Sequence, residues 1–167
     1  MTNPEEKNVR TRNFLAAFLG FLVITCFTVT AAEKNAGVPD KELMQKIMDA
    51  WSSLDASKPA AYYSKNADNV YFDIAPLKYQ AWDQYQKGAA QVLALYSSLK
   101  LTVENDARVH REGNLTWATA TFHLDGIHKD TNVKDDMDGR WTVVWKKEGG
   151  KWLIVHEHVS MPLGGGD

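Results

Sequence analysis

Apolar residues after position 39 recur at helical spacing. Leu43, Ile47 and Trp51 lie four residues apart, so their side chains share one face of a helix. Asp40 stands directly before this pattern, where its carboxylate can accept hydrogen bonds from the first free backbone amides. The pattern therefore predicts a helix over residues 40–54.

Three further patterns follow this helix. A proline at position 59 favours the first turn of a short second helix over residues 59–63. β-Branched and aromatic residues predict a strand over 69–74, which Pro76 ends. A longer helix is predicted over 78–99, because apolar side chains gather on one face: Trp82, Tyr85, Ala89, Val92, Tyr96 and Leu99.

The hydrophobic period changes to two after Lys100. Alternation predicts four strands, over residues 101–110, 115–125, 140–147 and 151–160. Glycines at the first and last junctions predict hairpin turns, and residues 125–138 read as a longer polar connection. Helices followed by a strand meander predict an α+β fold. We expect about three N-terminal helices on a strongly curved antiparallel sheet that forms a cone with a pocket.

The N-terminal segment has a different character. Lys7, Arg10 and Arg12 precede the stretch 13–32, which contains no charged residue and ends in two small alanines. A basic start, an apolar core and small residues are typical of a secretory signal peptide over residues 1–32. The alternative is an uncleaved anchor that spans a membrane through residues 13–32. Either interpretation predicts an exported domain, periplasmic or secreted.

Composition and charge narrow the possible functions of the remaining chain. Hydrophobic residues make up 44% and charged residues 24%, which is typical of a globular domain. The net charge of −2 offers no basic excess for phosphates, so we expect no nucleic-acid partner. Cys26, the single cysteine, lies in the apolar stretch, so a linker over 33–39, a domain over 40–162 and a tail over 163–167 contain no thiol. No phosphate loop or dinucleotide fingerprint is present, and we expect no cofactor.

The strand order and the closing strands resemble a known superfamily. Residues 142–162, TVVWKKEGGKWLIVHEHVSMP, are similar to the closing hairpin of the calcium/calmodulin-dependent kinase II association domain and of SnoaL-like domains. Residues 71–77, YFDIAPL, resemble the first strand and turn of the same group, the nuclear transport factor 2-like superfamily, which includes ketosteroid isomerase. The resemblance implies the cone-shaped fold but not one function, because this fold hosts enzymes, binding proteins and assembly modules.

Three titratable residues are candidates for catalysis. Asp73 matches the strand end that carries the general-base aspartate in ketosteroid isomerase, and an apolar cone would raise its pKa. Matching the later strands to the kinase association domain implies that His123 and Glu157 also point inward. The three side chains would then converge as an acid–base set, and a structural hydrogen-bond network is the alternative. The same match implies other inward positions: Thr119, Thr121, Trp141, Val143, Trp145, Leu153, Val155 and Val159.

Aromatic and apolar side chains are the candidates for ligand contacts. We predict that a small, mostly apolar molecule contacts Tyr62, Tyr71, Trp82, Tyr85, Trp141 and Val143. The first alternative is a cofactor-free isomerase, lyase or cyclase with Asp73 as base, and the second is a homo-oligomerisation module.

His156 and His158 lie two residues apart and therefore share one face of a strand. The implied parity points this face away from the cone, where the superfamily commonly forms a dimer. We predict a homodimer through this face. Two histidines at this spacing can also hold a metal ion, but no third ligand is evident in the sequence, and we expect no metal.

Overall fold

The computed structural model describes residues 38–163 of the chain. It contains two α-helices, one 3₁₀ helix and seven strands. In chain order these are α1 (Lys41–Ser52), η1 (Lys58–Tyr62), β1 (Val70–Phe72), β2 (Tyr79–Gln80), α2 (Ala81–Leu93), β3 (Tyr96–Val103), β4 (Arg108–Glu112), β5 (Leu115–His128), β6 (Lys134–Glu148) and β7 (Lys151–Ser160).

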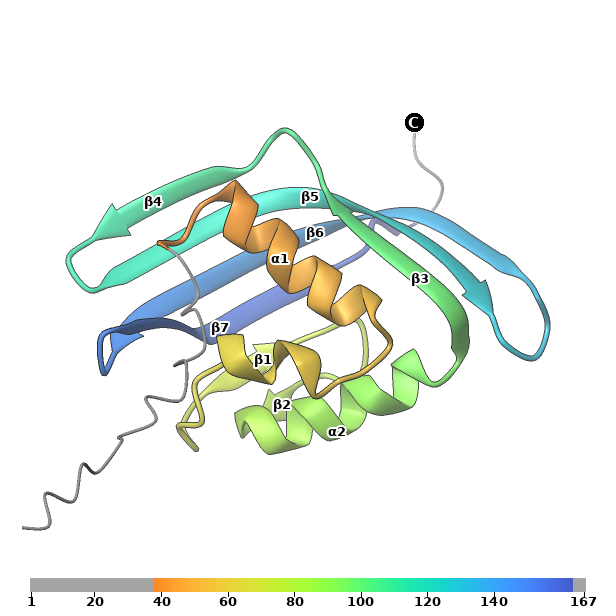
Figure 1. The fold of residues 1–167 in the computed structure, drawn as a ribbon, viewed down its shortest axis with the longest axis horizontal. Helices are drawn as coiled ribbons and strands as arrows, with labels where there is room; N and C mark the ends of the chain where they lie inside the picture. The colour runs from red at the N-terminus through yellow and green to blue at the C-terminus, as the bar shows by residue number, and fades with distance from the viewer. Residues whose placement is uncertain (1–37, 164–167) are drawn as a thin grey trace, which may run out of the picture. The chain divides into compact units, whose positions relative to one another are not determined.

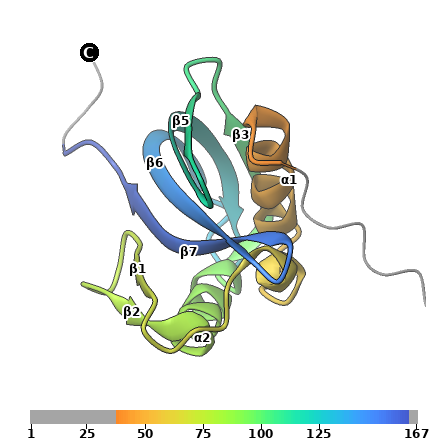
Figure 2. The ribbon, with the colours of Figure 1, turned by 90° about the vertical axis from the view of Figure 1, so that its left-hand side faces the viewer.

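All seven strands belong to one curved sheet, in the order β2-β1-β7-β6-β5-β3, with β4 paired to β5. The long strands β5, β6 and β7 are antiparallel neighbours, whereas β1 pairs with β7 in parallel. Both helices lie on the same side of this sheet, with α1 across its concave face (Figure 1 and Figure 2). The predicted α+β class and curved, mostly antiparallel sheet are confirmed.

Helix α1 forms as the sequence predicts. The Asp40 carboxylate accepts a hydrogen bond from the Leu43 amide at 2.7 Å and so caps the helix. The residues of the apolar stripe are buried against the sheet: Leu43, Met44, Ile47, Met48 and Trp51. Burial of this stripe supplies most of the stability of the helix, since a helix of this length is marginal in isolation.

The prediction of about three helices is wrong. Between residues 38 and 163 only α1 and α2 are α-helices, and the proline-led segment forms the 3₁₀ helix η1. Helix α2 ends at Leu93, so Tyr96 and Leu99 belong to strand β3 rather than to a helix over 78–99. Residues 96–103 pair with the far half of β5, and this backbone pairing outweighs the helical spacing of their apolar side chains.

The polar segment 125–138 is a hairpin, not a loop. Strand β5 continues to His128, β6 begins at Lys134, and Asp125 pairs with Asp136 across the two strands. The many charged residues of this segment hid the extension from the hydrophobic pattern: Asp125, Lys129, Asp130, Lys134, Asp135, Asp136 and Asp138. The predicted strand over 101–110 is likewise divided between β3 and β4.

Strand β7 contains a β-bulge. Val144 pairs with His156 and Trp145 pairs with Ile154, so Val155 has no partner residue on β6. The extra residue resets the alternation of side chains along the strand. Ile154 and Glu157 are therefore both buried, although they lie three residues apart.

The predicted signal peptide over 1–32 lies outside the described residues. Within residues 38–163, neither helix is long and apolar enough to cross a membrane.

Candidate functional site

A cavity of about 130 Å³ lies between the two helices and the concave face of the sheet. Most of its lining is apolar, and five aromatic side chains contribute to it: Trp51 from α1, Tyr85 from α2, Tyr96 from β3, Phe122 from β5 and Trp141 from β6. Among the described residues, the only carboxyl groups that line the cavity are those of Asp73 and Glu157. The curved sheet and the two helices thus enclose a pocket with aromatic walls and two acids.

Glu157 is the centre of a buried hydrogen-bond network. Its side chain lies on β7, and the residue is only 2% exposed. The Tyr63 hydroxyl donates to Oε1 at 2.8 Å, and the Trp141 ring nitrogen donates to Oε2 at 2.9 Å. The Trp51 ring nitrogen in turn donates to the Tyr63 hydroxyl oxygen at 3.0 Å. Side chains from both the helical layer and the sheet therefore hold the carboxyl group in place.

Burial raises the pKa of Glu157 to about 7, because the ionised carboxylate loses its hydration. Contacts with Tyr85, Tyr63 and Trp141 act in the opposite direction, since they stabilise the ionised form. The charge of Asp73 raises the pKa of Glu157 further. Near neutral pH the group is therefore able to take up or release a proton.

Asp73 follows β1 and lines the same cavity. Its Oδ1 accepts a hydrogen bond from the Ile74 amide at 2.7 Å. Burial raises the pKa of the Asp73 carboxyl, and the Ile74 amide partly offsets this effect. The structure therefore brings Asp73 and Glu157 to one cavity, as the sequence predicts.

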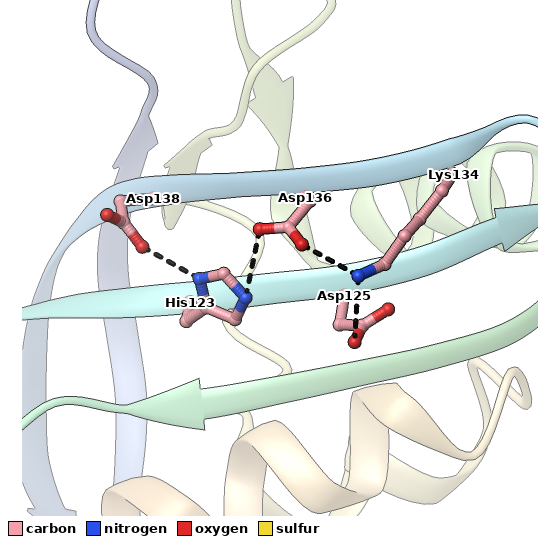
Figure 3. Close-up of polar contacts among 5 residues, drawn as sticks. All are labelled: His123, Asp125, Lys134, Asp136 and Asp138. Carbon is pink, nitrogen blue, oxygen red and sulfur yellow. Dashed lines mark hydrogen bonds and ion pairs between the residues drawn. The ribbon is translucent and has the colours of Figure 1, made fainter. Parts of the chain in front are cut away.

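His123 does not join these two carboxyl groups, so the predicted three-residue convergence is wrong. Phe122 and Leu124 point into the cavity, and His123 lies between them on the opposite face of β5. Its Nδ1 is 2.9 Å from Asp138 Oδ1, and its Nε2 is 3.4 Å from Asp136 Oδ1 (Figure 3). Hydrogen bonding to Asp138 and the charge of Asp136 raise the pKa of His123.

The same one-residue error affects the other implied positions on this strand. Ala118, Ala120 and Phe122 are buried, whereas Thr119 and Thr121 face outward with His123. A shift of one residue exchanges the two faces of a strand, so a single mismatch inverts every position. On β7 the implied positions Glu157 and Val159 do line the cavity, but the bulge buries Ile154 in place of its neighbours Leu153 and Val155.

The predicted ligand contacts divide into two groups. Tyr85 and Trp141 line the cavity. Tyr71, Trp82 and Val143 are buried in the surrounding core and do not line it. Tyr71 stacks on Tyr85 with ring centroids 5.1 Å apart, so it supports the wall from behind.

Tyr62 also lies outside the cavity lining, and the hydroxyl that reaches Glu157 belongs to its neighbour Tyr63. The sequence pattern did not single out Tyr63. Its role depends on tertiary contact: directly after η1 the chain changes to extended backbone and forms a bridge to Ile154 on β7.

His156 and His158 are on the outer face of β7, beside Phe72 of β1. The Phe72 ring meets His156 and His158 edge-on, with centroids 5.4 and 5.7 Å apart. His156 Nδ1 also lies 2.7 Å from the Val70 carbonyl oxygen. In residues 38–163, no three His, Cys, Asp or Glu side chains are grouped to hold a metal ion. The homodimer through this face stays a prediction.

Comparison with solved structures identifies the same fold in several bacterial proteins. A nuclear transport factor 2-like superfamily protein from Salmonella enterica serovar Typhimurium LT2 is 19% identical with a TM-score of 0.67, over 75% of this chain and 93% of that one. A candidate dehydratase of this family from Streptomyces avermitilis is 14% identical with a TM-score of 0.64, over 75% of this chain and 100% of that one. At these identities the likeness shows the fold alone.

A third similar structure, a candidate scytalone dehydratase from Novosphingobium aromaticivorans, is 10% identical with a TM-score of 0.65, over 74% of this chain and 81% of that one. None of the curated proteins compared with the chain matches it. The model of the SnoaL-like domain family, however, matches residues 41–164, which is well over half of the chain. The protein therefore belongs to the SnoaL-like domain family.

Proposed function

We propose that this domain binds a small, mostly apolar molecule in the cavity between its helices and its sheet. The observation that carries the proposal is a cavity of about 130 Å³ with an apolar, aromatic lining and two convergent carboxyl groups. Pockets that bind small molecules combine apolar walls with a few well-placed polar groups. An apolar cavity of about 150 Å³ binds benzene, so the volume suits a compact ligand with a single ring.

A cavity-filling variant tests this proposal. Ala89 is buried on α2 and lines the cavity, so Ala89→Leu places a larger side chain inside it. Ala90→Leu is the matched control, because Ala90 is the next residue on the same helix and is exposed. We expect benzene, followed by its effect on the NMR signals of the cavity residues, to bind the wild type and the control but not Ala89→Leu. Equal binding by all three proteins would contradict the proposal.

Acid–base catalysis is the second candidate function. It is favoured by the position of Asp73 and Glu157 at the wall of one cavity, where burial raises the pKa of both carboxyl groups. In this interpretation Asp73 is the general base of an isomerase, lyase or cyclase reaction, and Glu157 is its partner instead of His123. A carbon-13 NMR titration in which Asp73 has the pKa of an ordinary exposed aspartate would contradict this candidate.

Two proposals concern the whole protein. Export rests on the basic and apolar pattern of residues 1–32, and N-terminal sequencing of the protein from an exported fraction would test it. The homodimer rests on the outer face of β7, where His158 and Phe72 are exposed. A monomeric mass from light scattering would contradict the dimer.

A further inference from the structure

The charged side chains that line the cavity are all acidic. Asp73 and Glu157 line it, and among residues 38–163 no lysine, arginine or histidine does. The ion pairs among residues 38–163 involve neither of these two carboxyl groups. Tyr85 and Tyr96 also line the cavity, but burial raises the pKa of both phenols, so they stay neutral. The cavity thus holds two acids whose negative charge no side chain of the described domain balances.

Asp73 is the more available of the two acids. Glu157 already accepts a hydrogen bond on each of its oxygens, from Tyr63 and Trp141. The Asp73 carboxyl accepts one hydrogen bond, from its neighbouring Ile74 amide to Oδ1, and the described residues give Oδ2 none. A carboxylate oxygen that lines a cavity without a partner is an acceptor for an N–H donor of a ligand.

The aromatic walls favour the same sign of ligand charge. The faces of tryptophan and tyrosine rings attract cations, and the attraction is stronger where water is excluded. One ring beside these walls already contacts a cation, since the Lys65 ammonium lies 4.0 Å from the centroid of the Trp82 ring. Trp82 packs against Trp51 and Tyr85, which line the cavity, with centroids 6.1 and 6.0 Å apart.

We infer that the ligand of this cavity is a small organic cation, an apolar amine or ammonium compound whose nitrogen pairs with Asp73 beside Glu157. The inference rests on the proposed function and names its ligand class. An ammonium group neutralises the carboxylates, and its apolar body contacts the aromatic walls. An anion of the same shape is disfavoured, because it would add negative charge beside acidic groups in a cavity whose described lining contains no cation.

Two probes of nearly equal shape test the inference. Cyclopentylamine and cyclopentanol are both ring compounds close to benzene in size. They differ in charge, because at about pH 8 the amine is protonated and the alcohol is neutral. We expect calorimetry on the wild type to show cyclopentylamine binding at least about ten-fold more tightly than cyclopentanol. The preference should shrink towards pH 5, since Glu157 then becomes protonated. The groups that face Glu157 are Asp73 and the hydroxyls of Tyr63 and Tyr85, together with the Trp141 ring nitrogen.

Variants of the two acids test whether their carboxyl groups cause the preference for the amine. Asp73→Asn and Glu157→Gln remove one negative charge each with little change in shape, and we expect each to lose most of the preference for the amine. Asp68→Asn and Glu112→Gln are the matched controls, because both residues are exposed and lie outside the cavity. We expect them to bind the amine as the wild type does.

The outcomes separate the inference from the function on which it rests. Cyclopentanol binding as tightly as the amine would overturn the cationic ligand and leave the apolar pocket intact. If neither probe binds and benzene also fails to bind, the proposed function is overturned together with the inference. A preference for the amine that persists in both Asp73→Asn and Glu157→Gln would also overturn the inference, because the negative charge that attracts the amine would then lie elsewhere on the protein.

Discussion

The two faces of the sheet hold acids in opposite environments. On the inner face, Glu157 is almost completely buried and accepts hydrogen bonds from Tyr63 and Trp141. On the outer face, Asp136 and Asp138 lie beside His123, whose side chain is 36% exposed (Figure 3). The acids of both faces lie on neighbouring strands, β6 and β7. Their environments therefore differ in how deeply the carboxyl group is buried and not in the type of residue.

Burial decides whether a hydrogen-bonded carboxyl group has a raised or a lowered pKa. The inner carboxyl loses its hydration, so its pKa rises to about 7 despite several donors. The outer carboxylate Asp136 keeps its water, and hydrogen bonding from Lys134 lowers its pKa. Exposed ion pairs contribute little to stability, whereas removing one partner from a buried group is costly. The inner network should therefore dominate both stability and its dependence on pH.

The largest expected effect is a pH dependence of stability that comes from Glu157. Its pKa rises from an ordinary 4.5 to about 7 on folding, so the native state binds more protons than the unfolded state between these values. The free energy of unfolding should therefore fall as the pH rises through this interval, by about 3 kcal/mol. Urea unfolding at a series of pH values measures this change.

Glu157→Gln supplies the control, because it cannot ionise and retains an oxygen acceptor for Tyr63 or Trp141. The difference in unfolding free energy between the wild type and Glu157→Gln should therefore change with pH, because only the wild type has a glutamate that titrates at position 157. Asp73 acts in the same direction as Glu157, since its pKa is also raised, and its effect remains in both proteins. Parallel curves for the two proteins would show that Glu157 titrates as an ordinary glutamate.

A smaller effect is expected from Tyr63→Phe. The change removes the donor to Glu157 Oε1 and the acceptor for the Trp51 ring nitrogen, and both partners are buried. A buried polar group left without a partner costs about 1–3 kcal/mol, so the free energy of unfolding should fall by about 2 kcal/mol. Tyr62→Phe is the matched control, since Tyr62 is half-buried next door and lies outside this network. A loss of equal size in the control would refute a special role for the network.

The smallest effect is expected on the outer face. His123→Ala removes both contacts with Asp136 and Asp138, but these side chains are solvated. The free energy of unfolding should change by less than about 0.5 kcal/mol, as for most surface substitutions. A loss as large as that of Tyr63→Phe would mean that the two faces contribute equally and that burial is not the deciding factor.

Local patterns predicted the fold class and much of the architecture. The apolar stripe and the capping residue Asp40 place α1, and alternation places most of β5 and β7. Errors arose where backbone pairing outweighs the side-chain pattern. Residues 96–103 form a strand because they pair with β5, although the spacing of Tyr96 and Leu99 is also helical. Only contacts between distant segments decide such a case.

The site was predictable in part. Asp73 and Glu157 both line the cavity, as the resemblance to ketosteroid isomerase and to the kinase association domain implied. His123 was misplaced because β5 was matched one residue out of register, and a strand tolerates no such error. Tyr63 could not be distinguished from Tyr62 by residue type. Its role depends on the bridge that sets the segment after η1 beside β7.

The bulge at Val155 has a consequence for comparing this protein with its relatives. Val155 is an extra residue between Ile154 and His156, which pair with adjacent residues of β6. A relative without the bulge has one residue fewer at this point, so an ungapped alignment anchored on the residues before Val155 would place its cavity acid opposite His156. A single-residue gap at Val155 restores the correspondence. Searches for the same site in distant family members should therefore permit that gap before they judge the acid to be missing.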